Sequence, residues 1–219
     1  MYTKSLIMLF TLTFLVSYTA CFYAYSETNE SPPEKKKLAF VTKRSNLWYK
    51  HAKDLKEKDV PETAQIFLEG ELYSSLKKVK EIDKKNIDRS TPEGLIASYI
   101  SASKKGDVDW IAENFVDEDK DKILDLFKDK KVLKESMEGA KKIQAEVIRG
   151  EARYKGHLLL FIEQQYPKNI KVTETVACRK TTDGWKLTNL LSTDETFDIV
   201  FAAVSSGQVQ EVKQLTLVK

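Results

Sequence analysis

Cysteine, histidine and glycine are scarce in this chain of 219 residues, and each scarcity excludes a class of protein. The two cysteines, Cys21 and Cys178, are too few for a small scaffold held by several disulfides. The two histidines, His51 and His157, stand in no H-x-x-H or cysteine-paired arrangement, so no metal site is predicted. The eight glycines form no phosphate-cradling loop and no G-x-S-x-G motif. These patterns predict no catalytic residue, no cofactor and no metal.

A block of charge of one sign is also missing. The formal net charge is +3, from 36 basic and 33 acidic residues. The two signs alternate along runs such as "DEDKDKILDLFKDKKVLKE", which is typical of solvated helix faces. No surface for phosphate backbones is predicted, so nucleic acid is not an expected partner.

The first 26 residues differ in composition from the rest of the chain. Their one charge is Lys4, an apolar run spans residues 6–16, and Ala24-Tyr25-Ser26 forms a small-x-small cleavage site before Glu27. This pattern is typical of a secretory signal peptide over residues 1–26.

Two alternatives for this N-terminal segment stay open. The uncharged stretch is long enough to span a bilayer, so it could remain as an uncleaved anchor. Tyr18-Thr19-Ala20-Cys21 resembles a bacterial lipoprotein box, with Tyr18 where Leu is usual, which makes Cys21 a candidate for lipidation. All three interpretations place residues 27–219 outside the cytoplasm, periplasmic or secreted. Membrane contact is expected only through an uncleaved N-terminus or a lipidated Cys21.

Residues 27–88 are expected to form a linker followed by helices. The stretch "ETNESPPEKKK" (27–37) is polar and contains Pro32-Pro33, which predicts a flexible linker. Apolar residues recur at helical spacing through residues 38–88, which predicts a helical N-terminal extension. The three predicted apolar stripes are Trp48, Ala52 and Leu55, then Ala64, Phe67 and Leu68, then Leu72, Leu76 and Val79.

The clearest helix signals follow in residues 90–115. Ser90 and Glu93 predict a capping box, with Pro92 in the first turn of a helix. Gly106 is expected to end this helix and Asp107 to cap the next one. The residues expected to be buried are Leu95, Ile96, Tyr99 and Ile100 in the first helix and Trp110, Ile111 and Phe115 in the second. Another helix is predicted over residues 121–139.

After Gly139 the apolar period becomes alternating, which predicts β-strands. Ile143, Ala145 and Val147 are expected on the buried face of the first strand, and "TTDG" predicts a hairpin turn. A later strand is expected to place Ile170, Val172, Val176 and Cys178 on one face, with Cys178 as an inert core thiol.

The stretch "GHLLLFIEQQY" is apolar on both faces, so its outer face needs a cover. One cover is a C-terminal segment that carries Phe197, Val200, Phe201 and Val204 and follows a predicted capping box from Ser192 to Glu195. The other is a second copy of the chain, in a homodimer. The intrachain cover is preferred because its apolar stripe otherwise has no partner.

The order of these signals resembles the nuclear transport factor two-like superfamily, in particular its uncharacterised bacterial exported members. The resemblance covers residues 88–192 and rests on Thr91-Pro92-Glu93, Lys104-Lys105-Gly106-Asp107 and Asp183-Gly184-Trp185-Lys186. It implies an α+β fold in which a curved antiparallel sheet wraps around helices as a cone, here spanning residues 89–219.

The resemblance does not decide function, since this superfamily includes isomerases, dehydratases, transport adaptors and domains with no known ligand. Tyr99, Trp110 and Trp185 are candidates to line a ligand pocket in the cone. We predict an exported, non-enzymatic domain that binds a small apolar ligand or a protein partner. The alternative is a small isomerase-like or dehydratase-like enzyme acting on an apolar substrate, which an acid beside Tyr99 in an open pocket would favour.

Overall fold

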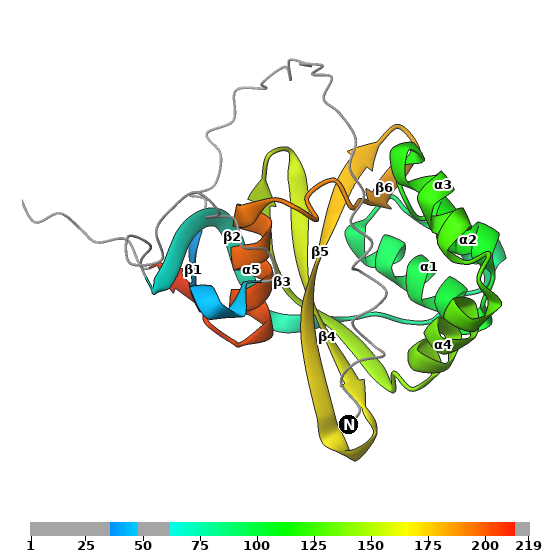
Figure 1. Cartoon of the computed structure of the whole chain (residues 1–219), viewed down its shortest axis with the longest axis horizontal. Coiled ribbons are helices and arrows are strands. Elements are labelled where there is room, and N and C mark those ends of the chain that lie inside the picture. The colour runs from blue at the N-terminus through cyan, green and yellow to red at the C-terminus, as the bar shows by residue number, and fades with distance from the viewer. Residues whose placement is uncertain (1–35, 48–61, 213–219) are drawn as a thin grey trace, which may run out of the picture.

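The computed structural model describes residues 36–47 and 62–212, which form an α+β structure with helices on both faces of one antiparallel sheet (Figure 1). Within these residues, seven strands pair in the order β6-β5-β4-β3-β2-β1-β7. The strands are β1 (Lys37–Lys43), β2 (Thr63–Lys78), β3 (Ala145–Tyr154), β4 (His157–Tyr166), β5 (Ile170–Thr181), β6 (Gly184–Leu187) and β7 (Val209–Val212). The five α-helices are α1 (Pro92–Lys105), α2 (Val108–Glu113), α3 (Asp117–Leu126), α4 (Lys130–Lys141) and α5 (Glu195–Ser205). The α+β class and the antiparallel sheet expected from the sequence are confirmed.

The sheet has two buried faces, each covered by different helices. On the face that we call the helical face, α1–α4 pack over even-numbered positions of β4 and β5, such as Leu160 and Val176. On the opposite face, which we call the α5 face, α5 packs over odd-numbered β4 positions and over β1. Figure 1 shows α5 beside β1 and β2, with α1–α4 on the other side of the sheet.

Strand β4 contributes side chains to the apolar cores on both faces of the sheet, as predicted from its run of apolar residues. Leu158, Leu160 and Ile162 belong to the helical-face core, whereas Leu159 and Phe161 belong to the α5-face core. The intrachain cover is therefore confirmed. Of the four residues in its predicted apolar stripe, only Phe201 is wrong, because Phe201 is half-buried and lies outside the α5-face core. The α5 residues that enter this core are Phe197, Ile199, Val200, Ala203 and Val204.

The helical prediction for residues 38–88 is wrong where the structure describes that segment. Lys37–Lys43 and Thr63–Lys78 are the strands β1 and β2, which pair with each other and belong to the same sheet as the later strands. The apolar residues of β2 fit both a helical and an alternating period. Ile66 and Leu68 enter the α5-face core at alternating spacing, and pairing with β1 and β3 satisfies the backbone of β2. The stripe at Trp48, Ala52 and Leu55 lies outside the described residues.

The signals around α1 are largely confirmed, with the cap displaced by one residue. The side chain of Thr91, not that of Ser90, accepts a hydrogen bond from the Gly94 N–H at 3.1 Å. Gly106 ends α1 at φ 67°, a left-handed conformation that favours glycine. The Asp107 side chain caps α2 by accepting from the Trp110 N–H at 3.0 Å.

Two further helix predictions need correction. The helix expected over 121–139 is divided into α3 and α4, because the Asp129 carboxylate accepts from the Lys131 N–H and starts a new helix. The cap of α5 is Asp194 and not Ser192, since Asp194 accepts from the Phe197 N–H at 3.1 Å.

Candidate functional site

Tyr99 lies in the middle of α1, on the side that faces the sheet. It is buried, and its ring packs edge-on against Phe115 with 5.8 Å between ring centroids. Burial and the negative charges of Glu174 and Glu146 raise the pKa of the Tyr99 hydroxyl, so it stays protonated at neutral pH. The sequence candidate Tyr99 therefore lies near two acids that the sequence patterns did not single out.

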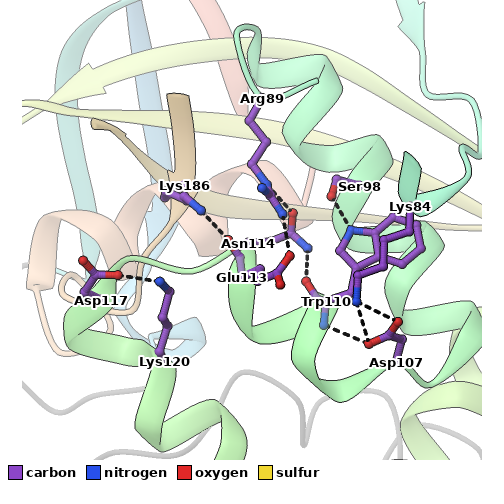
Figure 2. Close-up of polar contacts among 10 residues, drawn as sticks. All are labelled: Lys84, Arg89, Ser98, Asp107, Trp110, Glu113, Asn114, Asp117, Lys120 and Lys186. Atoms are coloured by element: carbon purple, nitrogen blue, oxygen red, sulfur yellow. Dashed lines mark hydrogen bonds and ion pairs between the residues drawn. The ribbon is translucent and has the colours of Figure 1, made fainter. Parts of the chain in front are cut away.

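Trp110 and Trp185, the other two candidates, have structural contacts of their own. Figure 2 shows the Trp110 indole directed at Ser98, to which its Nε1–H donates at 2.8 Å. Trp110 is fully buried, which makes it part of the core between α1 and α2. Trp185 is half-buried, and its backbone N–H donates to the Arg89 carbonyl at 2.7 Å. These contacts join β6 to the segment before α1.

A polar network beside Trp110 joins the end of α2 to Arg89 and to Lys186 of β6 (Figure 2). Arg89 Nε donates to Asn114 Oδ1 at 3.0 Å, and Asn114 Nδ2 donates to the Trp110 carbonyl at 2.7 Å. The Lys186 ammonium donates to the Glu113 carbonyl at the end of α2. Burial and the charges of nearby Arg89 and Lys120 lower the pKa of Lys186. Since each of these contacts ends on a helix terminus or its neighbour, we interpret the network as structural.

The candidate site lies on the helical face, where we define the acid cluster as Glu146, Gln164, Tyr166 and Glu174. Glu146 is directly opposite Gln164 across β3 and β4, and Glu174 is opposite Ile162 across β4 and β5. Because side chains alternate along a strand, these residues share one face with the core residues of β4. Along that face the lining changes from apolar to polar toward the β4–β5 hairpin, whose tip extends beyond the helices in Figure 1.

Gln164 connects the two acids by hydrogen bonds from one amide group. Its Nε2 donates to Glu146 Oε1 at 2.9 Å and to Glu174 Oε1 at 3.1 Å. Its Oε1 accepts from the Tyr166 hydroxyl at 2.9 Å. Both amide protons and the carbonyl of Gln164 are therefore used within the acid cluster.

Burial raises the pKa of both glutamates, Glu146 and Glu174. Glu146 is 6% exposed, and its Oε2 has no hydrogen-bond partner among the described residues. Desolvation, reinforced by the charge of Glu174, raises the pKa of Glu146 to about 8, and the Gln164 hydrogen bond and Lys104 only partly oppose this shift. Desolvation also raises the pKa of Glu174 to about 7, although Glu174 is more accessible than Glu146. Near neutral pH the pair therefore retains a proton.

In the described part of the chain, the cation that lowers the pKa of Glu146 is Lys104, and it already binds other groups. The Lys104 ammonium lies 2.6 Å from Glu81 Oε1 and donates to the Ile143 carbonyl at 3.0 Å. Its charge lowers the pKa of Glu146, but less than desolvation raises it. The acid cluster thus contains two carboxyl groups with no direct ion pair in the described part of the chain.

Such a cluster can hold or transfer one proton and can accept hydrogen bonds from a ligand. A carboxyl group whose pKa lies near the working pH is suited to general acid–base chemistry or to proton-linked binding. The described ranges contain no group of three or more His, Cys, Asp or Glu side chains arranged to hold a metal ion. Cys178 is fully buried, and desolvation raises the pKa of its thiol, which agrees with an inert core residue.

Glu146 was not singled out from the sequence, because Ala145 and Val147 were expected on the buried face of β3 together with Ile143, and only Ile143 is fully buried. Ala145 is exposed, and the buried positions are Glu146, Ile148 and Gly150. A shift of one residue moves every side chain to the other face. A usable signal was present in β5, where Glu174 interrupts the inward alternation of Val172, Val176 and Cys178.

No protein-family model matches this chain, and no curated protein or solved structure matches it. We therefore infer function from the geometry of the acid cluster. No helix in residues 36–47 and 62–212 combines the length and the apolar character that crossing a bilayer requires.

Proposed function

We propose that this chain is an exported, non-enzymatic domain that binds a small apolar ligand on the helical face of its sheet, with the acid cluster as the polar end of the site. One observation carries the proposal: Glu146 is buried beside apolar side chains and has an oxygen without a hydrogen-bond partner in the described residues. An unpaired buried polar group costs about 1–3 kcal/mol, so natural proteins rarely keep one without a role.

The surroundings of the acid cluster suit a ligand that is mostly apolar. Ile162 lies opposite Glu174 on the neighbouring strand, and Val172 lies opposite Gln164. Tyr99 faces the cluster from α1, as its electrostatic coupling to both glutamates indicates. Small-molecule sites typically combine such apolar walls with a few polar groups that orient the ligand.

Nuclear magnetic resonance titration of the mature chain with 1-hexanol tests this proposal. We expect amide shift changes to concentrate at Ile162, Gln164 and Val172. The backbone around Val200 and Ala203 on the α5 face serves as an internal control and should not shift. Changes spread equally over both faces, or no saturable change, would contradict the proposed site.

An acid–base enzyme is the second candidate, and the raised pKa of Glu146 beside Tyr99 and Tyr166 favours it. A carboxylate base near protonated tyrosines could move a proton next to a carbonyl group. The test is isomerisation of a β,γ-unsaturated ketone, followed by absorbance. Turnover that Glu146→Gln and Tyr99→Phe both abolish would replace the binding proposal with this one.

Kinship with the nuclear transport factor two-like superfamily, and the cone shape that it implies, form part of this proposal. Three motifs that carry the resemblance occupy consistent places: Thr91-Pro92-Glu93 opens α1, Gly106-Asp107 joins α1 to α2, and Asp183-Gly184 forms the β5–β6 turn. An experimental structure in which the sheet does not curve around α1 would contradict it.

Export through residues 1–26 is proposed on the lone Lys4, the uncharged run after it and the Ala24-Tyr25-Ser26 site. Intact-mass analysis of the chain expressed in a bacterium should find a mature protein that begins near Glu27 in the periplasm or medium. A mass that retains residues 1–26 in a salt-resistant membrane fraction would instead identify an anchor. A chain beginning at a lipid-modified Cys21 would identify a lipoprotein.

A further inference from the structure

We propose that the ligand of this site carries a cationic nitrogen, such as a primary ammonium group, which binds between Glu146 and Glu174. This inference rests on the proposed binding function and specifies its ligand class. The remainder of the ligand is a short apolar chain or ring that contacts the neighbouring apolar residues of β4 and β5. Four features of the acid cluster lead to this conclusion.

The first feature is the balance of hydrogen-bond donors and acceptors. Both amide protons of Gln164 are donated to the two glutamates, and the Tyr166 hydroxyl proton is donated to Gln164. The donors of Gln164 and Tyr166 are therefore used within the acid cluster. Glu146 Oε2 has no hydrogen-bond partner among the described residues. Once the pair has released its shared proton, a matching ligand must donate a hydrogen bond to this oxygen.

The second feature is the net charge of the groups that face the two acids. Tyr99 faces them from α1, and Gln164 and Tyr166 from β4, and all three are uncharged at neutral pH. Among the described residues, the cation that acts on Glu146 is Lys104 of α1, and its ammonium already binds Glu81. An additional cation would be attracted to this site, whereas an anion would be repelled.

The third feature is the proximity of the acids, which share a single amide as hydrogen-bond donor. Two ionised carboxylates so close together repel each other, so one proton remains on the pair in the free protein. An ammonium group between them would supply the missing donor to Glu146 Oε2 and neutralise the repulsion. Binding would then release the shared proton to solvent, and the site would gain one positive charge from the ligand in exchange.

The fourth feature is the position of the acid cluster along the sheet. Glu174 is more accessible than Glu146, so the ligand would enter from the Glu174 side, near the β4–β5 hairpin. Figure 1 shows this hairpin extending past the helices that cover the rest of the face. Val172, half-buried on the same strand face, borders this approach and suits an apolar ligand tail.

Three probes that differ only in their head group test the inference: hexylammonium, 1-hexanol and hexanoate, each titrated calorimetrically into the mature chain at pH 7.5. Because charge-assisted hydrogen bonds are the stronger ones, we expect hexylammonium to bind about tenfold more tightly than 1-hexanol, and hexanoate not to bind. Repeating the hexylammonium titration in buffers of different ionisation enthalpy should reveal proton release. Its affinity should rise between pH 6 and pH 9, as the acids lose their shared proton.

Glu146→Gln and Glu174→Gln should each reduce hexylammonium affinity by about tenfold and leave 1-hexanol binding unchanged. Glu163→Gln is the matched control, because Glu163 lies on β4 next to Gln164, faces the opposite side of the sheet and pairs with Arg149 and Lys171. It removes the same charge and should leave hexylammonium binding unchanged. Urea titration of each variant verifies that it is folded.

The possible failures are distinguishable. If 1-hexanol binds as tightly as hexylammonium, the cationic-ligand inference is overturned while the apolar binding function stands. If all three glutamate variants weaken hexylammonium equally, binding follows the overall charge and the inference is also overturned. If none of the three probes binds to the folded chain, both the inference and the proposed binding function fail.

Discussion

Both faces of the sheet bury a cluster of apolar side chains, but they differ in what else they bury. On the α5 face, Leu159 and Phe161 of β4 pack against Phe40 and Val200, and Phe40 and Phe161 meet edge-on with 5.8 Å between centroids. The buried carboxylate that its strands carry, Glu163, is paired with Arg149 and Lys171, and the buried Thr175 is uncharged. The helical face instead places two carboxyl groups among its apolar rows. Adjacent residues of one strand therefore serve stability on one side and, as we propose, binding on the other.

Removing α5, which covers the α5 face of the sheet, should have the largest effect on stability. A chain that ends at Ser192 lacks α5 and β7, so it exposes Leu159 and Phe161 and leaves β1 as an unpaired edge. We expect aggregation, or association into dimers, and loss of cooperative unfolding. Size-exclusion chromatography and denaturant titration provide the measurement. A truncated chain that is monomeric and as stable as the full chain would show that α5 is not needed as a cover.

Phe161→Ala should destabilise the domain by about 3–5 kcal/mol, because it removes a fully buried aromatic ring and leaves a cavity. The loss should be nearly the same at pH 5 and pH 8.5, since the acid cluster lies on the opposite face of the sheet. Urea unfolding at the two pH values measures it. A loss that changed strongly with pH would indicate that the two faces are coupled.

Glu146→Gln should raise the free energy of unfolding instead of lowering it, and the size of this gain should depend on pH. The folded-state pKa of Glu146 is raised from 4.5 to about 8, so the folded protein holds a proton that the unfolded chain releases. The wild-type chain therefore loses stability as the pH rises from about 4.5 to 8, because ionisation favours the unfolded state. The amide keeps an acceptor for Gln164 and does not ionise. At pH 8.5 we expect the variant to be more stable by on the order of 2–3 kcal/mol, and at pH 5 to equal the wild type within about 0.5 kcal/mol.

Urea titrations across this pH range are the measurement, with Glu163→Gln as the control. The pKa of Glu163 is lowered by its pairing with Lys171 and Arg149, so removing that carboxylate should cost stability at pH 8.5 instead of adding it. If Glu146→Gln were destabilising at pH 8.5, Glu146 would have to be ionised and well paired in the folded protein.

Tyr166→Phe should give the smallest effect, a loss of about 1 kcal/mol, because it removes one hydrogen bond to Gln164 and keeps the ring. The same change releases Gln164 Oε1 to accept a bond from a ligand, so hexylammonium binding should be preserved or slightly stronger. Thermal unfolding and calorimetry measure the two effects. A loss of more than 3 kcal/mol would mean that Tyr166 supports the β4–β5 hairpin more broadly than its single bond indicates.

The sequence predicted the parts of the fold that depend on local chemistry. Pro92, Gly106 and Asp107 each have a backbone role that few other residues fill, and all three occupy the predicted places. The two-sided character of β4 was also readable, because five apolar residues in succession cannot lie on a wet face.

The features of the fold that depend on pairing with residues distant in the sequence were not predicted. The apolar residues of β2 satisfy a helical period, and only pairing with β1 and β3 makes it a strand. The register of β3 depends on β4, with a bulge between Ile148 and Gly150, so the sequence alone assigned Ala145 and not Glu146 to the core. Tyr99 was a candidate from the sequence and stays a prediction, whereas finding the acid cluster required the strands to be placed side by side.

The position of β1 in the sheet has a consequence for the order of folding. β1 is held between β2 and β7, with Lys37 opposite Val212 at the far end of the described chain. During synthesis this edge of the sheet must wait for the segment around Val212, so the β1–β2 pair keeps an open edge until that segment has been translated. Contacts between such distant segments also slow folding, because a long loop must close before they form.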